Sequence, residues 1–260
     1  NLEKQQIINN ENYHLISSLD EIDKWIEEAE EVGEVAVDTE TTSLDPHQAD
    51  LVGISLCSKV GKACYIPVGH NSPKCIKKEE VIKKLKKILE DPSIKKIGQN
   101  IKFDFIVFYN HGIILSSIED TMLMSYVLDA GKNRHNMDTL SEIHLGHKTI
   151  SFKEIVGTGK KEINFSEVDL NKAKDYAAED ADITFRLYKK FIKNLKSEKM
   201  INIYEIFEKP LIKILAFMEI EGVEIDSKFL KSLSSKFEKK IQKLEKEVFK
   251  ISKKEFNIAS

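Results

Sequence analysis

The chain is poor in arginine and cysteine and has no long apolar run. Of its 260 residues, 40 are lysine or arginine, and the only arginines are Arg134 and Arg186. Cys57, Cys64 and Cys75 are odd in number and lack the close paired spacing of zinc sites, so we expect free thiols. No apolar stretch approaches the ~20 residues that a membrane helix needs, and the start lacks a signal pattern. These absences predict a soluble, intracellular protein with no membrane contact.

The composition is otherwise that of a globular protein. A hydrophobic content of 41% supports a proper core, and nothing in the sequence requires more than a monomer. The net charge of −3 gives no overall sign of nucleic-acid binding, because an acidic pocket can offset basic residues elsewhere. The bias toward lysine is typical of an AT-rich genome. It fits a bacterial cytoplasm, with association to the nucleoid, and equally an organelle of bacterial descent.

The two arginines are candidates for roles that lysine cannot fill. A guanidinium group grips a phosphate or a carboxylate with two hydrogen bonds. Arg134 ends a loop-like stretch at 131–134, which favours a phosphate contact. Arg186 lies one turn beyond Asp182 in a helical pattern, which predicts an ion pair within that helix.

Periodicity indicates an α/β fold with a mixed sheet. Alternating apolar residues predict strands over 13–16, 35–39, 51–57, 63–68 and 95–98. Helical spacing predicts helices over 20–31, 77–89, 102–110 and 118–128. From Asp169 onward the pattern is helical, with breaks expected at Lys209–Pro210 and at Gly222. Three early strands with short connections, followed by alternating helices, are typical of this class.

The C-terminal stretch 228–254 is rich in lysine and has helical spacing. Its apolar residues fall on one side and would form a stripe on a single helix, with a basic solvated face opposite. The stripe consists of Leu230, Leu233, Phe237, Ile241, Leu244 and Phe249.

Asp38 and Glu40 close a strand-like run. Side chains two apart on a strand point the same way, so both carboxylates would share one face. Two like charges held close together must neutralise or bind a cation, and a divalent metal ion satisfies both acids.

Two later segments add further candidate side chains. The stretch from Asn100 to Asp104 follows a short apolar run, and 176–180 lies in a long helical pattern. There the four-residue spacing stacks the Tyr176 phenol and the Asp180 carboxylate on one face. We expect Glu179 and Asp182 to face solvent.

These three segments resemble the exonuclease motifs of the DEDD nuclease superfamily, in the subclass with tyrosine in the third motif. They read DTETTSLD at 38–45, GQNIKFD at 98–104 and YAAEDAD at 176–182. They are most similar to the 3′–5′ proofreading exonuclease domain of bacterial-type, family A DNA polymerase I. Residues 208–211 and 222–226 resemble the segment that leads into the polymerase thumb.

The resemblance implies a ribonuclease H-like mixed sheet flanked by helices and followed by a C-terminal helical extension. It implies an exonuclease domain at 1–207 and the helical start of a polymerase domain at 208–260, with no polymerase active site. It also implies two divalent ions, Mg²⁺ or Mn²⁺, and a single-stranded or frayed DNA 3′ end as partner. The implied catalytic residues are Asp38, Glu40, Asp104, Tyr176 and Asp180, of which the four acids would bind metal.

The same resemblance implies a set of contacts to nucleic acid. Leu44 and Phe152 would lie against the terminal bases, and Asn100, Lys102, Phe103 and Arg134 would lie near the strand. Apolar and stacking contacts tolerate any base, so binding would not depend on sequence.

Two alternative functions remain open. One is an RNA 3′ exonuclease resembling ribonuclease D, and the other is a catalytically silent DNA-binding module, which the presence of all four acids argues against. A phosphate loop at 157–160 is rejected, because Glu154 stands where the motif needs its first glycine. His144 and His147 have no acidic neighbour in the sequence, so we expect surface or core histidines.

Overall fold

A six-stranded mixed sheet forms the centre of the chain in a computed structural model that describes residues 8–258. The strand order is β1-β4-β3-β2-β5-β6. β3 is antiparallel to β2 and β4, whereas the pairs β1–β4, β2–β5 and β5–β6 are parallel. The strands are β1 Tyr13–Leu15, β2 Glu34–Thr41, β3 Leu51–Lys59, β4 Lys62–Pro67, β5 Lys95–Gly98 and β6 Ile118–Asp120.

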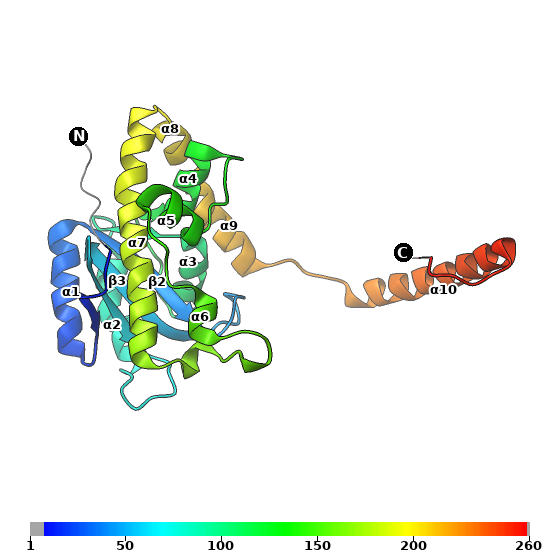
Figure 1. Ribbon diagram of the computed structural model, residues 1–260, viewed down its shortest axis with the longest axis horizontal. Helices are drawn as coiled ribbons and strands as arrows, with labels where there is room; N and C mark the ends of the chain where they lie inside the picture. Colours follow the sequence, from blue (N-terminus) through cyan, green and yellow to red (C-terminus); the bar gives the residue numbers. More distant parts are fainter. Residues whose placement is uncertain (1–7, 259–260) are drawn as a thin grey trace. The chain divides into compact units, whose positions relative to one another are not determined.

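Alternation along β2 separates the two faces of the sheet. Val35 and Val37 belong to one buried cluster, while Ala36 belongs to another. The first cluster contains buried residues of α1 (Leu19–Val32), α2 (Lys78–Glu90) and α3 (Ile101–Asn110). The second contains residues of α4 (Thr121–Asp129), α5 (Met137–Leu145) and α7 (Leu170–Ser197), and Figure 1 shows α7 crossing the sheet. The predicted α/β fold with a helix-flanked mixed sheet is confirmed.

One predicted helix begins too early. The range 118–128 was expected to be helical throughout, but Ile118–Asp120 is strand β6, and α4 begins at Thr121. The Asp120 side chain caps α4 by accepting hydrogen bonds from the backbone N–H groups of Met122 and Leu123. A three-residue strand is too short to show alternation, so its apolar residues merge with the pattern of the helix that follows.

The predicted break at Lys209–Pro210 is also wrong. The chain leaves helical geometry earlier, at Lys199, whose φ is 59°. It then continues through α8 (Ile201–Ile203) and a π-helical turn, η3 (Tyr204–Glu208), into α9 (Lys209–Glu221). Proline lacks an N–H donor but is tolerated in a first helical turn, and here the wide π turn precedes it. The predicted break at Gly222 is confirmed, because α9 ends at Glu221.

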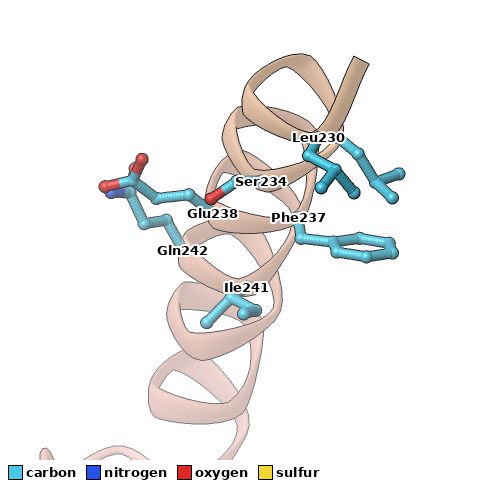
Figure 2. A pocket seen from close by; sticks show the side chains of 7 residues that line it. Leu230, Ser234, Phe237, Glu238, Ile241 and Gln242 are labelled. Atoms are coloured by element: carbon cyan, nitrogen blue, oxygen red, sulfur yellow. The ribbon is translucent and has the colours of Figure 1, made fainter. Parts of the chain in front are cut away.

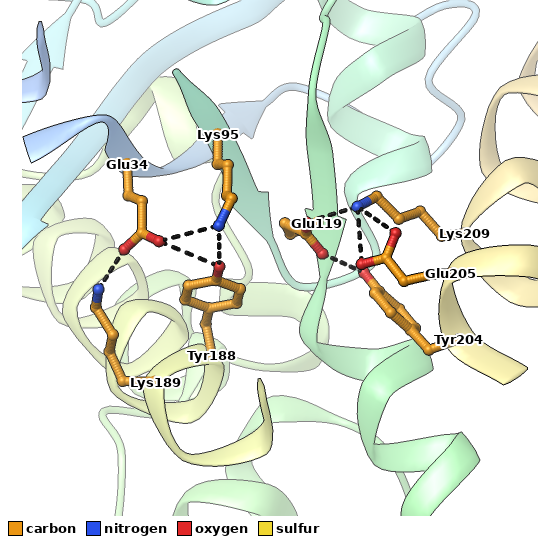
Figure 3. A network of polar contacts seen from close by, with 8 residues as sticks. All are labelled: Glu34, Lys95, Glu119, Tyr188, Lys189, Tyr204, Glu205 and Lys209. Carbon is orange, nitrogen blue, oxygen red and sulfur yellow. Dashed lines mark hydrogen bonds and ion pairs between the residues drawn. The ribbon is translucent and has the colours of Figure 1, made fainter. Parts of the chain in front are cut away.

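Two polar networks tie α7, η3 and α9 to the strands β2, β5 and β6 (Figure 3). In one, the Tyr188 hydroxyl and the Lys95 ammonium both contact Glu34 at 3.3 Å. In the other, the buried Tyr204 hydroxyl donates to Glu119 at 2.9 Å. The remaining members are Lys189, which pairs with Glu34, and Lys209 and Glu205, which pair with each other.

The chain divides into two compact units, between Ile220 and Glu221. The second unit contains α10 (Ser227–Ser252), which confirms the expected lysine-rich helix. None of its residues is buried, and Leu230, Phe237 and Ile241 project from it with more than two-fifths of their surface exposed (Figure 2). The expected apolar stripe is therefore present and open.

Two smaller expectations concern thiols and membranes. All three cysteines are free, and Cys57 and Cys64 are buried. Over residues 8–258, none of the helices has both the length and the apolar character that crossing a bilayer requires.

Candidate active site

β2 carries two acidic side chains on the sheet face that α7 covers. Asp38 and Glu40 alternate with Thr39 and follow Ala36, which packs into the cluster on the α7 side. Glu40 lies opposite Gly53 of β3, one position before the strand register shifts. The predicted common face of the two acids is confirmed.

α7 brings a third acid to the same place. One ligand-type oxygen from each of Asp38, Glu40 and Asp180 lies within 4.8 Å of the others. Asp180 is 4% exposed and Glu40 is 7% exposed. These three carboxylates, called here the acidic cluster, come from elements 140 residues apart in the chain and form the arrangement that could hold a metal ion.

Burial and mutual repulsion shift the proton equilibria of these acids. Burial raises the pKa of Asp38 to about 7. The pKa of Glu40 lies well above its usual range, because the carboxyl is buried and lies close to Asp38 and Asp104. Burial also raises the pKa of Asp180, and the nearby Asp38 and Glu40 add to that rise. Without a bound cation, these acids keep protons near neutral pH, where exposed carboxylates would already be ionised.

Asp104 lies beside this cluster but is not part of it. The acid is in the first turn of α3, where its Oδ1 accepts hydrogen bonds from the Thr39 backbone N–H at 3.0 Å and the Thr39 hydroxyl at 2.6 Å. Its pKa is raised by burial and by the charge of Asp38. We did not predict a role for Thr39. It lies between Asp38 and Glu40 on the strand, so its side chain points to the opposite face of the sheet from theirs.

Asp120 fixes the start of α3. Its two oxygens accept hydrogen bonds from the backbone N–H groups of Asn100 at 3.1 Å and Ile101 at 3.0 Å. Asn100 has a φ of 61°, in the left-handed region that asparagine tolerates better than most residues. The Tyr204 hydroxyl in turn accepts from the Asp120 backbone N–H at 2.9 Å. The sequence pattern gave no sign of this support, because it joins three distant segments.

Tyr176 lies in an aromatic group next to the acidic cluster. Its ring centroid is 6.0 Å from that of Phe152 and 6.0 Å from that of Phe165, and the last two rings are stacked at 6.1 Å. Burial raises the pKa of Tyr176, and the negative charges of Asp180, Glu40 and Asp38 add to that rise. The phenol therefore remains protonated and able to donate a hydrogen bond. Phe165 is 2% exposed and was not predicted.

The predicted nucleic-acid contacts are spread over loops and helix starts. Leu44 is 93% exposed after β2, and Phe152, at the start of α6 (Phe152–Val156), is 43% exposed. Arg134 and Asn100 are exposed, whereas Phe103 and Lys102 are half-buried. The Lys102 ammonium pairs with Glu219. Phe152 meets a predicted catalytic residue directly, because its ring contacts that of Tyr176.

The expectation that Asp182 faces solvent is wrong. Its side chain is completely buried and accepts from the Tyr13 hydroxyl at 2.9 Å and the Gly61 backbone N–H at 2.7 Å. Arg186 Nε also donates to it at 3.0 Å, which confirms the predicted ion pair within the helix. Segments near β1 and β4 cover this face of α7, which helical spacing alone does not reveal.

The expectation that Glu179 faces solvent is wrong as well. Glu179 is 6% exposed, and its carboxylate contacts His147 Nε2 at 2.8 Å and the Ile150 backbone N–H at 2.6 Å. His147 thus has the acidic partner that its sequence neighbourhood lacks. His144 packs edge-on against Phe191, with ring centroids 4.8 Å apart, as expected of a core histidine.

Comparison with known proteins gives a consistent result. A family model described as 3′-5′ exonuclease matches residues 13–196. DNA polymerase I of Rhizobium leguminosarum is 39% identical over 95% of this chain and 26% of its own length. The Pseudomonas aeruginosa DNA polymerase I is 38% identical over 92% of this chain and 27% of its own length. The chain therefore spans about a quarter of the length of these curated relatives.

Solved structures share the fold. The POL domain of Pol1 from M. smegmatis, in complex with DNA primer-template and dNTP, superposes with a TM-score of 0.76 at 18% identity, over 95% of this chain and 39% of that one. Escherichia coli RNase D gives a TM-score of 0.64 at 20% identity, over 79% of this chain and 50% of that one.

Proposed function

Because this chain belongs to the 3′–5′ exonuclease family, we propose that it removes nucleotides from DNA 3′ ends by metal-dependent phosphodiester hydrolysis. The proposal places the chain in a longer polymerase of the DNA polymerase I type, as its proofreading module. The observation that carries it is the acidic cluster of Asp38, Glu40 and Asp180. Buried carboxylates with raised pKa values are a costly arrangement that bound cations would relieve.

The donor set fits two divalent ions, Mg²⁺ or Mn²⁺. Both prefer oxygen ligands, and carboxylates supply them. Asp38, Glu40 and Asp180 would hold the first ion, and Asp38 and Asp104 would hold the second, Asp104 partly through water. Bound ions of this kind lower the pKa of water and stabilise the leaving 3′ oxygen. Thr39 would keep Asp104 oriented, since its hydroxyl and its N–H both donate to Oδ1.

Tyr176 would position the attacking water. A phenol has an unperturbed pKa of about 10 and is a poor base near neutral pH. The environment here raises the Tyr176 pKa further, so the side chain serves as a hydrogen-bond donor rather than a proton acceptor. Its packing against Phe152 and Phe165 restricts where the hydroxyl can point.

The proposed DNA contacts favour a frayed end. Leu44 and Phe152 are exposed apolar side chains that could lie against terminal bases, and a base stacked on the Phe152 ring would contribute roughly 1–3 kcal/mol. Asn100, Lys102, Phe103 and Arg134 would lie along the strand. A mismatched end unpairs more easily than a matched one, so it would reach this site more often.

We propose that residues 1–207 form the exonuclease domain and residues 208–260 the start of the polymerase domain, with the chain acting as a monomer. Residues 1–7 and 259–260 of these ranges lie outside the described residues. α9 nevertheless packs on the exonuclease side, where Ile212 and Ala216 are buried. The helical start of the polymerase would then begin as part of the exonuclease core.

A substrate comparison tests this proposal. Single-stranded DNA labelled at its 5′ end, and RNA of the same sequence, are incubated with Mg²⁺ or Mn²⁺, or with a chelator. We expect a metal-dependent ladder that shortens from the 3′ end of the DNA and is absent for Asp38→Ala. Preference for the RNA would favour the ribonuclease D-like alternative, since a site can sense the 2′-hydroxyl. Binding of DNA without cleavage by the native chain would favour a silent module.

A further inference from the structure

Glu179 holds together two segments that are far apart in sequence. It lies in the middle of α7, directly before Asp180, and is 6% exposed. One carboxylate oxygen contacts His147 Nε2 at 2.8 Å, and the other accepts the Ile150 backbone N–H at 2.6 Å. Hydrogen bonds to a buried carboxylate are among the stronger ones in proteins. Both oxygens of Glu179 are therefore engaged with a segment about thirty residues upstream.

The segment 146–151 depends on such side-chain contacts, because it has no helix or strand of its own. Two side-chain hydrogen bonds also tie it to α5, beside the backbone bonds of Gly146 and His147 to the end of that helix. The Ser141 hydroxyl donates to the His147 carbonyl at 2.8 Å, and the Thr149 hydroxyl donates to Asp138 at 2.7 Å. The contacts to α5 and the contacts to Glu179 alternate along the segment. Together they set its path between the two helices.

This segment delivers Phe152 to the site. Ile150, the second contact of Glu179, is two residues before Phe152, which begins α6. Helix α6 has five residues, and the Ser151 side chain makes no capping hydrogen bond. A helix this short has little stability of its own. The Phe152 ring meets Tyr176 edge-on and stacks on Phe165, and its backbone position is set by how the preceding segment is held.

We propose that Glu179 and His147 are positioning residues that hold Phe152 in place for the DNA end. This inference rests on the proposed function, since it assigns these side chains to the binding step of the same reaction. Glu179 shares a helical turn with Asp180 and, through Ile150, is linked to the base-contacting ring. It therefore keeps the aromatic contact aligned with the acidic cluster, although neither Glu179 nor His147 touches the nucleic acid.

Steady-state kinetics on single-stranded DNA with Mn²⁺ test the inference through the separation of KM from kcat. Glu179→Ala should raise KM on the order of tenfold, as expected for losing a charged hydrogen-bonding partner, with little change in kcat. His147→Ala should also raise KM, but by less, because Glu179 still accepts the Ile150 backbone N–H. Glu179→Gln should restore most of the affinity, since the amide oxygen can still accept from the Ile150 N–H and the amide group can still hydrogen-bond to His147 Nε2.

A double-mutant cycle identifies the connection to Phe152. If Glu179 acts through that ring, Glu179→Ala combined with Phe152→Ala should raise KM no more than Phe152→Ala alone. Glu142→Gln, on the exposed surface of α5, is the matched control and should behave like the native chain. Thermal melts verify that each variant is folded at the assay temperature.

The outcomes separate this inference from the proposed function. A native chain that leaves DNA intact would refute the function itself. With an active native chain, three results would overturn the positioning role: an unchanged KM in Glu179→Ala, additive effects of Glu179→Ala and Phe152→Ala, or a Glu179→Gln variant as impaired as Glu179→Ala. The last result would show that the negative charge matters and the hydrogen bonds do not.

Discussion

Three buried acids and the half-buried Asp38 dominate the chemistry at the scale of single residues. Asp38, Glu40, Asp104 and Asp180 all have raised pKa values, and in each case burial is the largest cause. The folded chain therefore favours their protonated forms unless cations are bound. This cost to stability gives the site a measurable dependence on pH and on metal ions.

The Asp38 carboxyl should make the metal-free chain less stable as pH rises. Burial raises its pKa from 3.8 to about 7, so between these values the folded state holds a proton that the unfolded state has released. Stability is then present at low pH and is lost as pH rises toward 7. In thermal melts with chelator, Asp38→Asn should gain a few degrees over the native chain at pH 8 and nothing near pH 4. An equal advantage at both pH values would contradict the assignment.

Tyr176→Phe should slow hydrolysis without abolishing it. Loss of a positioning hydroxyl is expected to lower kcat by about 100-fold, while the ring still packs against Phe152 and Phe165. Asp38→Ala should remove activity completely, because it takes away a ligand proposed for both ions. Single-turnover rates at saturating Mn²⁺ give this comparison. Equal and complete loss in the two variants would show that the phenol does more than position water.

Single-residue patterns predicted part of this site. The two-residue spacing of Asp38 and Glu40 placed both on one face, and Asp180, which the family resemblance had implied, lies with them in the structure. Glu179 and Asp182 were misjudged, because helical spacing identifies a face without telling what covers it. Their partners, among them His147 and Tyr13, come from segments that sequence alone does not bring together.

At the scale of elements, β3 and β4 support the acidic cluster through a glycine. A Cβ atom at Gly53 would lie 2.1 Å from the Tyr65 hydroxyl, so the ring occupies the space that a side chain would take. Tyr65 is fully buried, and its hydroxyl is 2.7 Å from His70 Nε2. Gly53 also lies opposite Glu40 across the strand pair. The Tyr65 ring therefore has little freedom to move, and its position is linked to that of Glu40 through Gly53.

Gly53→Ala should destabilise the chain by about 1–3 kcal/mol, the usual cost of overpacking a core. Urea unfolding curves would give this value. Tyr65→Ala also destabilises the chain, but it removes the ring that the new methyl group would clash with. The variant that combines Gly53→Ala with Tyr65→Ala should therefore lose less stability than the sum of the losses in the two single variants. Strictly additive losses would mean that the strands separate and the clash never forms.

Two boundary errors at this scale share a cause. Strand β6 was absorbed into a helix because three residues do not show a period, and Pro210 was taken as a break although a π turn accommodates it. In both cases long-range hydrogen bonds set the outcome, such as those of Tyr204 with Glu119 and Asp120. For longer helices and strands with strong periodicity, the predicted ends lie within about three residues of the observed ones.

At the scale of the whole molecule, the hydrophobic core lies in the first unit. All three clusters of buried residues lie within residues 13–216, and among them only Ile212 and Ala216 come from α9. Phe217 adds an edge-on contact to Phe105 at 5.5 Å. Lys209 contributes an ion pair with the buried Glu119 at 2.6 Å. Within residues 8–258, the buried clusters of the first unit therefore include α9 and end there.

Two truncations should differ sharply in stability. A chain that ends after Gly222 keeps every buried cluster and should melt close to the full chain. A chain that ends at residue 207 loses Ile212 and Ala216 from the core and should be less stable by at least about 3 kcal/mol. Circular dichroism melts of both chains give the comparison. Equal stability of the two would mean that α9 is dispensable and that the fold closes at residue 207.

We propose that the acidic cluster binds divalent ions in order to hydrolyse DNA from its 3′ end. The most direct measurement is the initial rate of nucleoside monophosphate release from single-stranded DNA as Mn²⁺ is titrated into chelator-treated protein, with the native chain and Asp38→Asn side by side. We predict that the native rate rises from zero to saturation and that the Asp38→Asn rate stays near zero. Release that persists in chelator, or an Asp38→Asn curve matching the native one, would contradict the account.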